Sequence, residues 1–372
     1  MKVSIESLLK KHFTDEEITN LQKKKVLHTD HFNEILLVRL TSGYKDYQRG
    51  SIFYDDGFIT GYPRIMRILH LKNGINRYFK GKFYIEEKMD GYNVRIAMIG
   101  GKPLAFTRGG FICPFTTHRI PDLIDLNFFD KYPGYTINGE VVGPGSPYNT
   151  ESIPYIKEDV VFFAFDLSDK NGRYLSIEER YKILDQFKTP QVRRWGPYSV
   201  SDVDTIKELI LELDRDGREG IVIKPISNGE TIKYVTLSSC LRDLQATADL
   251  MTELPPGFYI QRILRAVFFC HEFGVSLDDR YLLEAAKALY LSPESVLKEV
   301  EDNENIKESF HIKVRSKNTV YELMEHLRRY GVTSKLLSIE KMDDYYITKF
   351  SRIYTKGTKE IRRKLTGHGF YD

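Results

Sequence analysis

A single lysine, Lys88, combines several features that nucleophilic chemistry requires. It follows the apolar run at residues 83–85 and two glutamates, and Asp90 and Gly91 come directly behind it. An amine attacks well near neutral pH only when burial or neighbouring cations disfavour its ammonium form. Gly91 permits a turn and a close approach of the backbone to a bound ligand. The pattern K-x-D-G alone is equally typical of an exposed lysine at a strand end, so its companions decide its meaning.

Further lysines and carboxylates follow Lys88 at or beside short apolar runs that are typical of strands. They are Glu140 after Asn138 and Gly139, Asp166 after Phe165, Glu219 and Lys224 around residues 221–223, and Lys233. Three lysines gathered at strand edges need a compensating negative charge, which a triphosphate with a divalent metal would supply. Glu140 and Glu219 can accept ribose hydroxyl bonds or hold Mg²⁺ through oxygen. The Phe165 ring can cover an adenine face.

This ordered set resembles the nucleotidyltransferase motifs of the covalent-nucleotidyl superfamily, which comprises DNA ligases, RNA ligases and mRNA capping enzymes. Motif I (K-x-D-G) is similar to residues 88–91, motif III (D-G-E) to 138–140 and motif IIIa to 162–166. Motif IV (E-G-x-x-x-K) is similar to 219–224, and motif V to 232–233. The chain departs from the pattern at Asn138, where Asp is common, and at residues 232–234, which hold one lysine instead of two.

Three features favour an RNA ligase within this superfamily. Asn93 resembles the K-x-x-G-x-N form of motif I in RNA ligases, where DNA ligases and capping enzymes usually have Arg. Arg108, in the stretch 107–109, resembles the arginine of motif Ia, which contacts nucleotide and acceptor strand. A helical segment at 255–300 follows motif V in place of the short strands of an OB-fold. The chain thus resembles, over nearly its whole length, the homodimeric RNA ligase family best known from archaea.

The resemblance implies an ATP-dependent enzyme that joins or circularises single-stranded RNA with 5′-phosphate and 3′-hydroxyl ends, with single-stranded DNA as a second candidate substrate. Its cofactors would be ATP and Mg²⁺ or Mn²⁺, and it would form a homodimer through the helical insert. The implied catalytic residues are Lys88, Lys224, Lys233 and Glu140. The implied nucleotide-binding residues are Glu86, Asn93, Arg108, Phe165, Glu140, Lys224 and Lys233. Glu219 and Asp90 are the candidate metal ligands, and Arg108 also the candidate RNA contact.

Short β-type runs broken by Gly and Pro, mixed with helices, predict an α+β fold with largely antiparallel sheets. We expect an N-terminal module (1–62), a central ATP-grasp-like adenylyltransferase domain (63–236), a helical dimerisation domain (237–303) and a small C-terminal α/β domain (304–372). A capping box at Ser176 predicts a helix to about residue 187, and 202–213 reads as another. An apolar stripe of helical spacing is either core or dimer face; its members are Ile260, Ile263, Leu264, Val267 and Phe268, with Phe269 beside it.

The segment 347–365 is rich in cations and contains one acid, Glu360. Its cations either line a solvated helix face or follow the backbone of single-stranded RNA. In the second case Arg362, Arg363 and Lys364 contact phosphate, and nearby aromatic rings stack on bases. The candidate rings are Tyr346, Phe350 and Tyr354.

Bulk composition sets wider limits. The 372 residues are 41% hydrophobic and 29% charged, an ordinary globular balance. A formal net charge of +3 is too small to demand or exclude nucleic acid. Three distant cysteines, 113, 240 and 270, fit reduced intracellular thiols better than a disulfide framework or a zinc site. No stretch approaches the about 20 apolar residues of a membrane span, so we expect a soluble cytoplasmic protein without membrane partners.

Alternatives remain open at this point. A capping-type guanylyltransferase would use the same lysine with GTP, and a DNA ligase would prefer nicked duplex DNA. A protein that binds RNA ends without catalysis is the alternative outside the enzymes. Glu86 and Glu87 either lie at solvated strand ends or, in the case of Glu86, border the adenine. His118 is interpreted as a surface histidine and not as a catalytic base.

Overall fold

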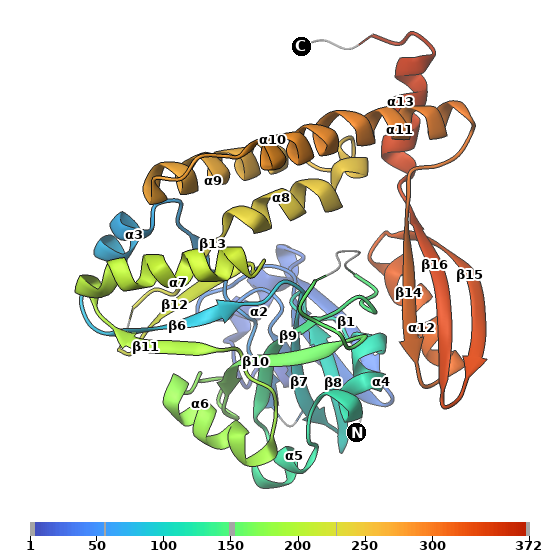
Figure 1. The fold of residues 1–372 in the computed structure, drawn as a ribbon. Coiled ribbons are helices and arrows are strands. Elements are labelled where there is room, and N and C mark those ends of the chain that lie inside the picture. The colour runs from blue at the N-terminus through green and yellow to red at the C-terminus, as the bar shows by residue number, and fades with distance from the viewer. Residues whose placement is uncertain (1–3, 56, 149–152, 228, 370–372) are drawn as a thin grey trace. The chain divides into compact units, whose positions relative to one another are not determined.

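The computed structural model describes residues 4–55, 57–148, 153–227 and 229–369. The chain forms two compact units, each assembled from three separate segments (Figure 1). The first unit contains Met1–Arg64, Gly91–Val141 and Val161–Gln191. The second contains Ile65–Asp90, Val142–Val160 and Val192–Asp372. The predicted 63–236 segment therefore contributes to both units, and the proposed domain limits stay predictions.

Two four-stranded sheets form the first unit. The order in one is β1-β2-β3-β4, antiparallel throughout: β1 Leu27–Phe32, β2 Ile35–Leu40, β3 Ile52–Tyr54 and β4 Gly57–Ile59. The order in the other is β10-β9-β7-β8: β10 Val161–Ser168, β9 Thr136–Val142, β7 Tyr92–Ile99 and β8 Lys102–Thr107. The α-helices of the first unit are α1 Ile5–Leu9, α2 Asp15–Lys23, α4 Pro114–Leu123, α5 Asn127–Lys131 and α6 Ile177–Leu184.

Apolar side chains join the two sheets of this unit. Leu37 and Ile52 from the first sheet pack in one buried cluster with Ile99, Leu104 and Phe106 from the second. Burial of side chains this size is worth roughly 1.5–3 kcal/mol each relative to exposure. The N-terminal module is therefore held by a shared core.

A five-stranded sheet forms the centre of the second unit, in the order β11-β6-β12-β13-β5. Its strands are β11 Arg194–Tyr198, β6 Phe83–Lys88, β12 Gly220–Pro225, β13 Ile232–Val235 and β5 Met66–Arg67. All neighbours are antiparallel except β13 and β5. Successive strand residues point to opposite faces, and one face here is apolar. Ile85, Ile221, Ile223 and Ile232 from that face form a buried core with the helices α3 Leu71–Tyr78 and α7 Val203–Arg215.

Helices dominate the next part of the second unit. They are α8 Leu237–Ala246, α9 Gly257–Phe273, α10 Asp279–Ala286, the single-turn π-helix Lys287–Leu291 and α11 Ser292–Glu301. The last part contains β14 Lys307–Val314, α12 Lys317–Arg329, β15 Thr333–Met342, β16 Tyr345–Ile353 and α13 Thr355–Leu365. Its sheet has the order β14-β16-β15. Among the described residues, no helix has both the length and the apolar character that crossing a membrane would require.

The α+β prediction is confirmed, and several elements begin close to their predicted limits. The capping box at Ser176 is present: the Ser176 hydroxyl accepts from the Glu179 backbone N–H, and the Glu179 carboxylate accepts from the Ser176 backbone N–H. The helix continues as a 3₁₀ turn to Phe187. The predicted 202–213 helix is α7, from Val203 to Arg215. The segment 347–365 divides between two elements, because its first part is the central strand β16.

Gly139 of β9 provides a test of the packing in the first unit. A Cβ atom at this position would lie 2.2 Å from Cζ of Phe162 and 2.6 Å from the Phe163 carbonyl oxygen. Gly139→Ala should therefore lower the free energy of unfolding by about 1–3 kcal/mol, measured by denaturant titration. Gly257→Ala is the control, since a Cβ there meets nothing within 4 Å. Equal midpoints for Gly139→Ala and the unmodified protein would contradict this packing.

Candidate active site

The face of the five-stranded sheet opposite its apolar core carries the predicted catalytic lysines. Glu86 pairs with Val222, Val222 pairs with Lys233, and Lys224 pairs with Tyr84. Directly paired residues point to the same face of a sheet, and so do residues two apart along one strand. Lys88, Lys224 and Lys233 consequently share one face with Glu86. Short-range sequence pattern predicted the strands, and long-range register brings the lysines together.

Lys88 forms an ion pair with Glu219. The Lys88 Nζ donates a hydrogen bond to Oε1 of Glu219, and the Lys88 side chain is largely buried. Burial raises the pKa of Glu219 to about 7, with Lys88 opposing this shift and the nearby Asp90 carboxylate adding to it. The other carboxylate oxygen of Glu219, Oε2, is buried and accepts no hydrogen bond from the residues described. Motif I and motif IV are thus in direct contact.

A second ion pair joins Lys224 and Glu86. The Lys224 Nζ lies 2.8 Å from Oε2 of Glu86, and both side chains are buried. Ionised groups removed from water are tolerated when they are paired. The interpretation of Glu86 as a solvated strand end is therefore wrong.

Glu87 is also buried, so the interpretation of Glu87 as a solvated strand end is wrong as well. Arg193 Nε lies 2.6 Å from one of its carboxylate oxygens, and Arg218 Nη1 lies 3.1 Å from the other. The Arg218 guanidinium also stacks on the Tyr155 ring at 3.5 Å. Neither arginine was among the predicted site residues. Arg218 stands directly before Glu219 of motif IV, which is the only local signal that pointed to it.

The remaining predicted nucleotide-binding residues belong to the first unit. Asn93 of β7 and Glu140 of β9 are directly paired across the two strands, so their side chains share a face. Arg108 follows the end of β8 and donates from Nη2 to the carbonyl oxygen of Pro63 at 2.9 Å. Phe165 lies in β10, with its ring centroid 5.0 Å from that of Tyr62.

A fully buried arginine, Arg95, supports this part of the first unit. Its guanidinium donates to the carbonyl oxygens of Thr60, Gly50 and Thr107 at 2.6–3.0 Å. Its strand partner is Asn138, also buried, which stands where the superfamily has Asp. Arg95 therefore fixes the end of β8 immediately before Arg108. No pattern in the sequence distinguished this arginine from an exposed one.

The basic segment near the C-terminus is only partly available for RNA. Phe350 is completely buried and stacks on Phe310 with centroids 5.0 Å apart, so the prediction that its ring stacks on bases is wrong. The hydroxyl of Tyr354 donates to Glu308. Arg362 donates to the carbonyl oxygens of Asn303 and Glu304 at 3.1 and 3.2 Å. Arg363 and Lys364 are exposed on α13, and Lys364 pairs with Glu360.

Family models and a relative match most of this chain. A family model described as RNA ligase matches residues 81–235, and one described as Ligase Pab1020 C-terminal region matches residues 246–368. An uncharacterized protein of Methanocaldococcus jannaschii is 30% identical over 362 residues, covering 92% of this chain and 91% of the relative.

Solved structures agree over nearly the whole chain. One form of an archaeal ATP-dependent RNA ligase has a TM-score of 0.90 at 28% identity, covering 99% of this chain and 100% of the other. A provisionally assigned ATP-dependent DNA ligase from Aquifex aeolicus has a TM-score of 0.89 at 35% identity, covering 96% and 100%.

Fold and motifs together define a nucleotidyltransferase of the ligase and capping-enzyme superfamily. Within it, the chain belongs to the RNA ligase family. The capping-enzyme and binding-protein alternatives are thereby set aside.

Proposed function

We propose that Lys88 carries AMP during the reaction. The observation that supports this most is the placement of Lys88, Lys224 and Lys233 on one sheet face, with Glu219 in contact with Lys88. The neutral Lys88 amine attacks the α-phosphorus of ATP, so that an N–P bond forms. The bond from this phosphorus to the bridging oxygen breaks, and pyrophosphate leaves with that electron pair.

The ion pair with Glu219 has a consequence for this step. An ammonium group that donates to a carboxylate has no free electron pair, so Lys88 must leave Glu219 and lose a proton before it attacks. Glu219 Oε2 is a buried carboxylate oxygen without a hydrogen bond in the described part of the chain, which fits a divalent cation. We assign Glu219 and Asp90 to hold Mg²⁺ or Mn²⁺, which would add positive charge beside the α-phosphate.

The other predicted residues position the nucleotide and the RNA. Asn93 and Glu140 orient the ribose, Phe165 covers the adenine, and Glu86 borders it. Lys224 and Lys233 stabilise the charge that spreads over the α-phosphate oxygens. An oxygen of the RNA 5′-phosphate then attacks the AMP phosphorus and breaks the N–P bond. Finally the RNA 3′-hydroxyl attacks the activated 5′-phosphorus and AMP leaves.

Lys88→Ala tests the nucleophile. The variant should form no adduct with α-labelled ATP in denaturing electrophoresis, and joining of 5′-phosphorylated RNA should fall by more than about 1000-fold. Joining of chemically pre-adenylated RNA should persist, because that step uses no nucleophilic amine. Lys72→Ala, on the exposed side of α3, is the control and should keep the adduct. Full labelling of Lys88→Ala would remove Lys88 from this role.

The polynucleotide is tested in the same assay. The Aquifex aeolicus structure is described as a DNA ligase, so nicked duplex DNA is the substrate to compare with single-stranded RNA. We expect single-stranded RNA to be joined faster than single-stranded DNA or nicked DNA. Label from ATP, and not from GTP, should appear on Lys88.

We also propose that the chain forms a homodimer through its helical segment. Large apolar side chains are exposed there: Ile260, Ile263, Leu264, Val267, Phe268, Leu282, Leu283 and Leu291. An apolar surface of this kind usually marks an interaction site. The stripe on α9 is therefore not core. Phe269 is buried in the core of the second unit and does not belong to this surface.

Charge on this surface should separate the subunits. The double variant Val267→Glu with Phe268→Glu should shift the mass measured by light scattering from dimer to monomer. Burying carboxylates without cationic partners in an apolar interface is unfavourable, so the two subunits should separate. Tyr321→Glu on α12 is the control, since this side chain is also exposed but lies outside the helical segment. An unmodified protein that is monomeric at micromolar concentration would refute the interface.

The exposed end of α13 is proposed to contact RNA phosphates. Removing Arg363 and Lys364 together, as glutamines, should flatten the slope of log affinity against log salt by roughly 1.4, which is about 0.7 per phosphate contact. Arg362 is left intact because it holds two carbonyl groups. Arg328→Gln with Arg329→Gln is the control, since both pair with Glu325. Equal slopes for both double variants would return RNA binding to Arg108.

A further inference from the structure

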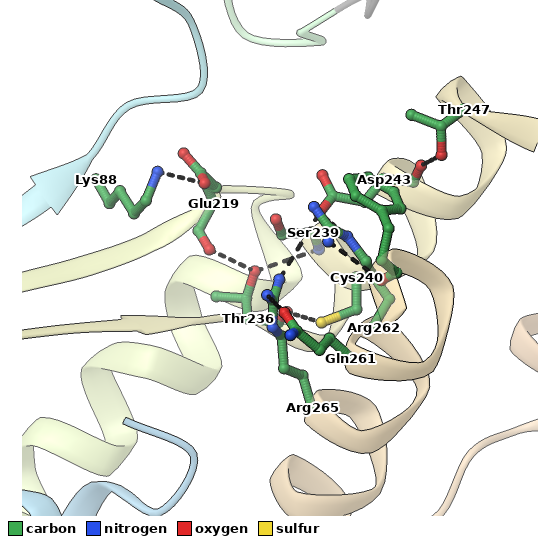
Figure 2. A network of polar contacts seen from close by, with 11 residues as sticks. Lys88, Glu219, Thr236, Ser239, Cys240, Asp243, Thr247, Gln261, Arg262 and Arg265 are labelled. Atoms are coloured by element: carbon green, nitrogen blue, oxygen red, sulfur yellow. Dashed lines mark hydrogen bonds and ion pairs between the residues drawn. The ribbon is translucent and has the colours of Figure 1, made fainter. Parts of the chain in front are cut away.

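Three arginines gather around one carboxylate next to the candidate active site. Arg262 and Arg265 come from α9, Arg67 from β5, and Asp243 from α8. Arg262 is fully engaged (Figure 2): its Nε lies 2.7 Å from Oδ2 of Asp243, and its Nη1 donates to the Phe258 carbonyl at 3.2 Å. Its guanidinium also stacks on the Phe258 ring. The Asp243 charge is thus committed to Arg262.

Arg265 and Arg67 have much less compensation. The Arg265 side chain is 9% exposed, and its Nη2 donates to Gln261 Oε1 at 3.2 Å. Its Nη1 lies 4.0 Å from Asp243 Oδ2, which is too long for a hydrogen bond. That nitrogen is buried without an acceptor in the described part of the chain. Arg67 makes no side-chain hydrogen bond or ion pair with any residue described. Its pKa is lowered by burial, and the pKa of Arg265 falls to about 10 through burial and the neighbouring Arg67 and Arg262.

The charges around this cluster do not balance. Arg67, Arg262 and Arg265 share one carboxylate, Asp243, and Glu219, which also acts on Arg67, already pairs with Lys88. Buried guanidinium groups that face one another repel, and an unsatisfied buried donor is unfavourable. A compact anion with several negative charges would satisfy both conditions at once.

The cluster lies beside the residues assigned to the α-phosphate. Arg67 is the direct partner of Lys233 in the parallel pair β5–β13, so it extends the row of Glu86, Val222 and Lys233. Among the charged groups acting on Arg67, Glu219 is the strongest, and Glu219 contacts Lys88. The hydroxyl of Thr236, which caps α8, bonds to the Glu219 carbonyl at 3.2 Å. Figure 2 shows Lys88, Glu219 and Thr236 together with Asp243, Arg262 and Arg265.

We propose that Arg67 and Arg265, held in place with Arg262 and Asp243, bind the β- and γ-phosphates of ATP while Lys88 meets the α-phosphate. The same groups receive pyrophosphate as it leaves and neutralise the oxygen that takes the electron pair. A nucleic acid strand spaces its phosphates along an exposed track, whereas this cluster is small and mostly buried, which favours pyrophosphate. The inference rests on the proposed attack by Lys88.

Pyrophosphorolysis tests the proposal directly. Enzyme carrying labelled AMP is mixed with increasing pyrophosphate, and release of ATP is followed. In Arg67→Gln and Arg265→Gln, the pyrophosphate concentration for half-maximal release should rise on the order of 10- to 100-fold, because a charge-assisted hydrogen bond is lost. The KM for ATP should rise in parallel, and Arg67→Lys and Arg265→Lys should recover part of both losses. Joining of pre-adenylated RNA should not change.

Arg77→Gln, an exposed arginine on α3, is the matched control and should match the unmodified protein throughout. An unchanged pyrophosphate response in both cluster variants overturns the proposal. So does a selective loss of pre-adenylated RNA joining, which would assign the arginines to an RNA phosphate.

Calorimetric titration of pyrophosphate into Lys88→Ala, with and without the cluster substitutions, separates the two hypotheses. Pyrophosphate binding that depends on Arg67 and Arg265 supports the site even if no lysyl adduct forms in the unmodified protein. Failure of the adduct alone counts against the proposed function. Binding that ignores both arginines counts against the site.

Discussion

The hydrogen-bond register of β6, β12 and β13 determines the chemistry of the second unit. In this register Ile85, Ile221 and Ile223 enter the core, and the charged residues between them take the opposite face. A slip of one residue would exchange the two faces and place lysines in the core. The isoleucines therefore position Lys224 and Lys233 as effectively as any contact those lysines make themselves.

Charges on that face are held by pairing and not by solvent. Lys224 with Glu86 and Lys88 with Glu219 each combine a cation and an anion that are largely removed from water. Glu87, which points to the opposite face of the sheet, likewise accepts from two arginines. Pairs of this kind contribute little net stability, because desolvation offsets their attraction. Their effect is to give each side chain one defined position. In the proposed reaction, Lys88 would therefore begin each cycle from one defined position.

Much of the fold, and the residue types of the candidate site, could be predicted from the sequence alone. The features that could not be predicted have physical causes. Lys88, Glu219 and Lys224 could be predicted as site residues because nucleotidyl transfer needs particular residue types at short spacing along the chain. The cations of 347–365 predicted either a helix face or an RNA-tracking groove with Phe350 as one candidate base-stacking ring. The structure instead places Phe350 in the central strand β16, where it packs on Phe310. Helical spacing likewise left the α9 stripe undecided between core and surface.

Contacts between residues far apart in the sequence could not be predicted. Arg67 meets Lys233 through a parallel strand pair, and Arg265 arrives on a helix that packs against α8. No spacing along the sequence links positions 67, 233 and 265. The ion pairs of Glu87 with Arg193 and Arg218 were missed for the same reason.

The alternation of segments between the two units has a consequence for synthesis of the chain. The first unit ends with Val161–Gln191 but begins at the N-terminus, and three segments of each unit alternate along the sequence. Leu37 and Ile52 bury themselves against Leu104 and Phe106, which emerge from the ribosome later. At the usual rate of about 5–20 residues per second, the partners of these side chains are synthesised about 3–14 seconds later. The N-terminal module can therefore complete its buried core only after β8 has been synthesised.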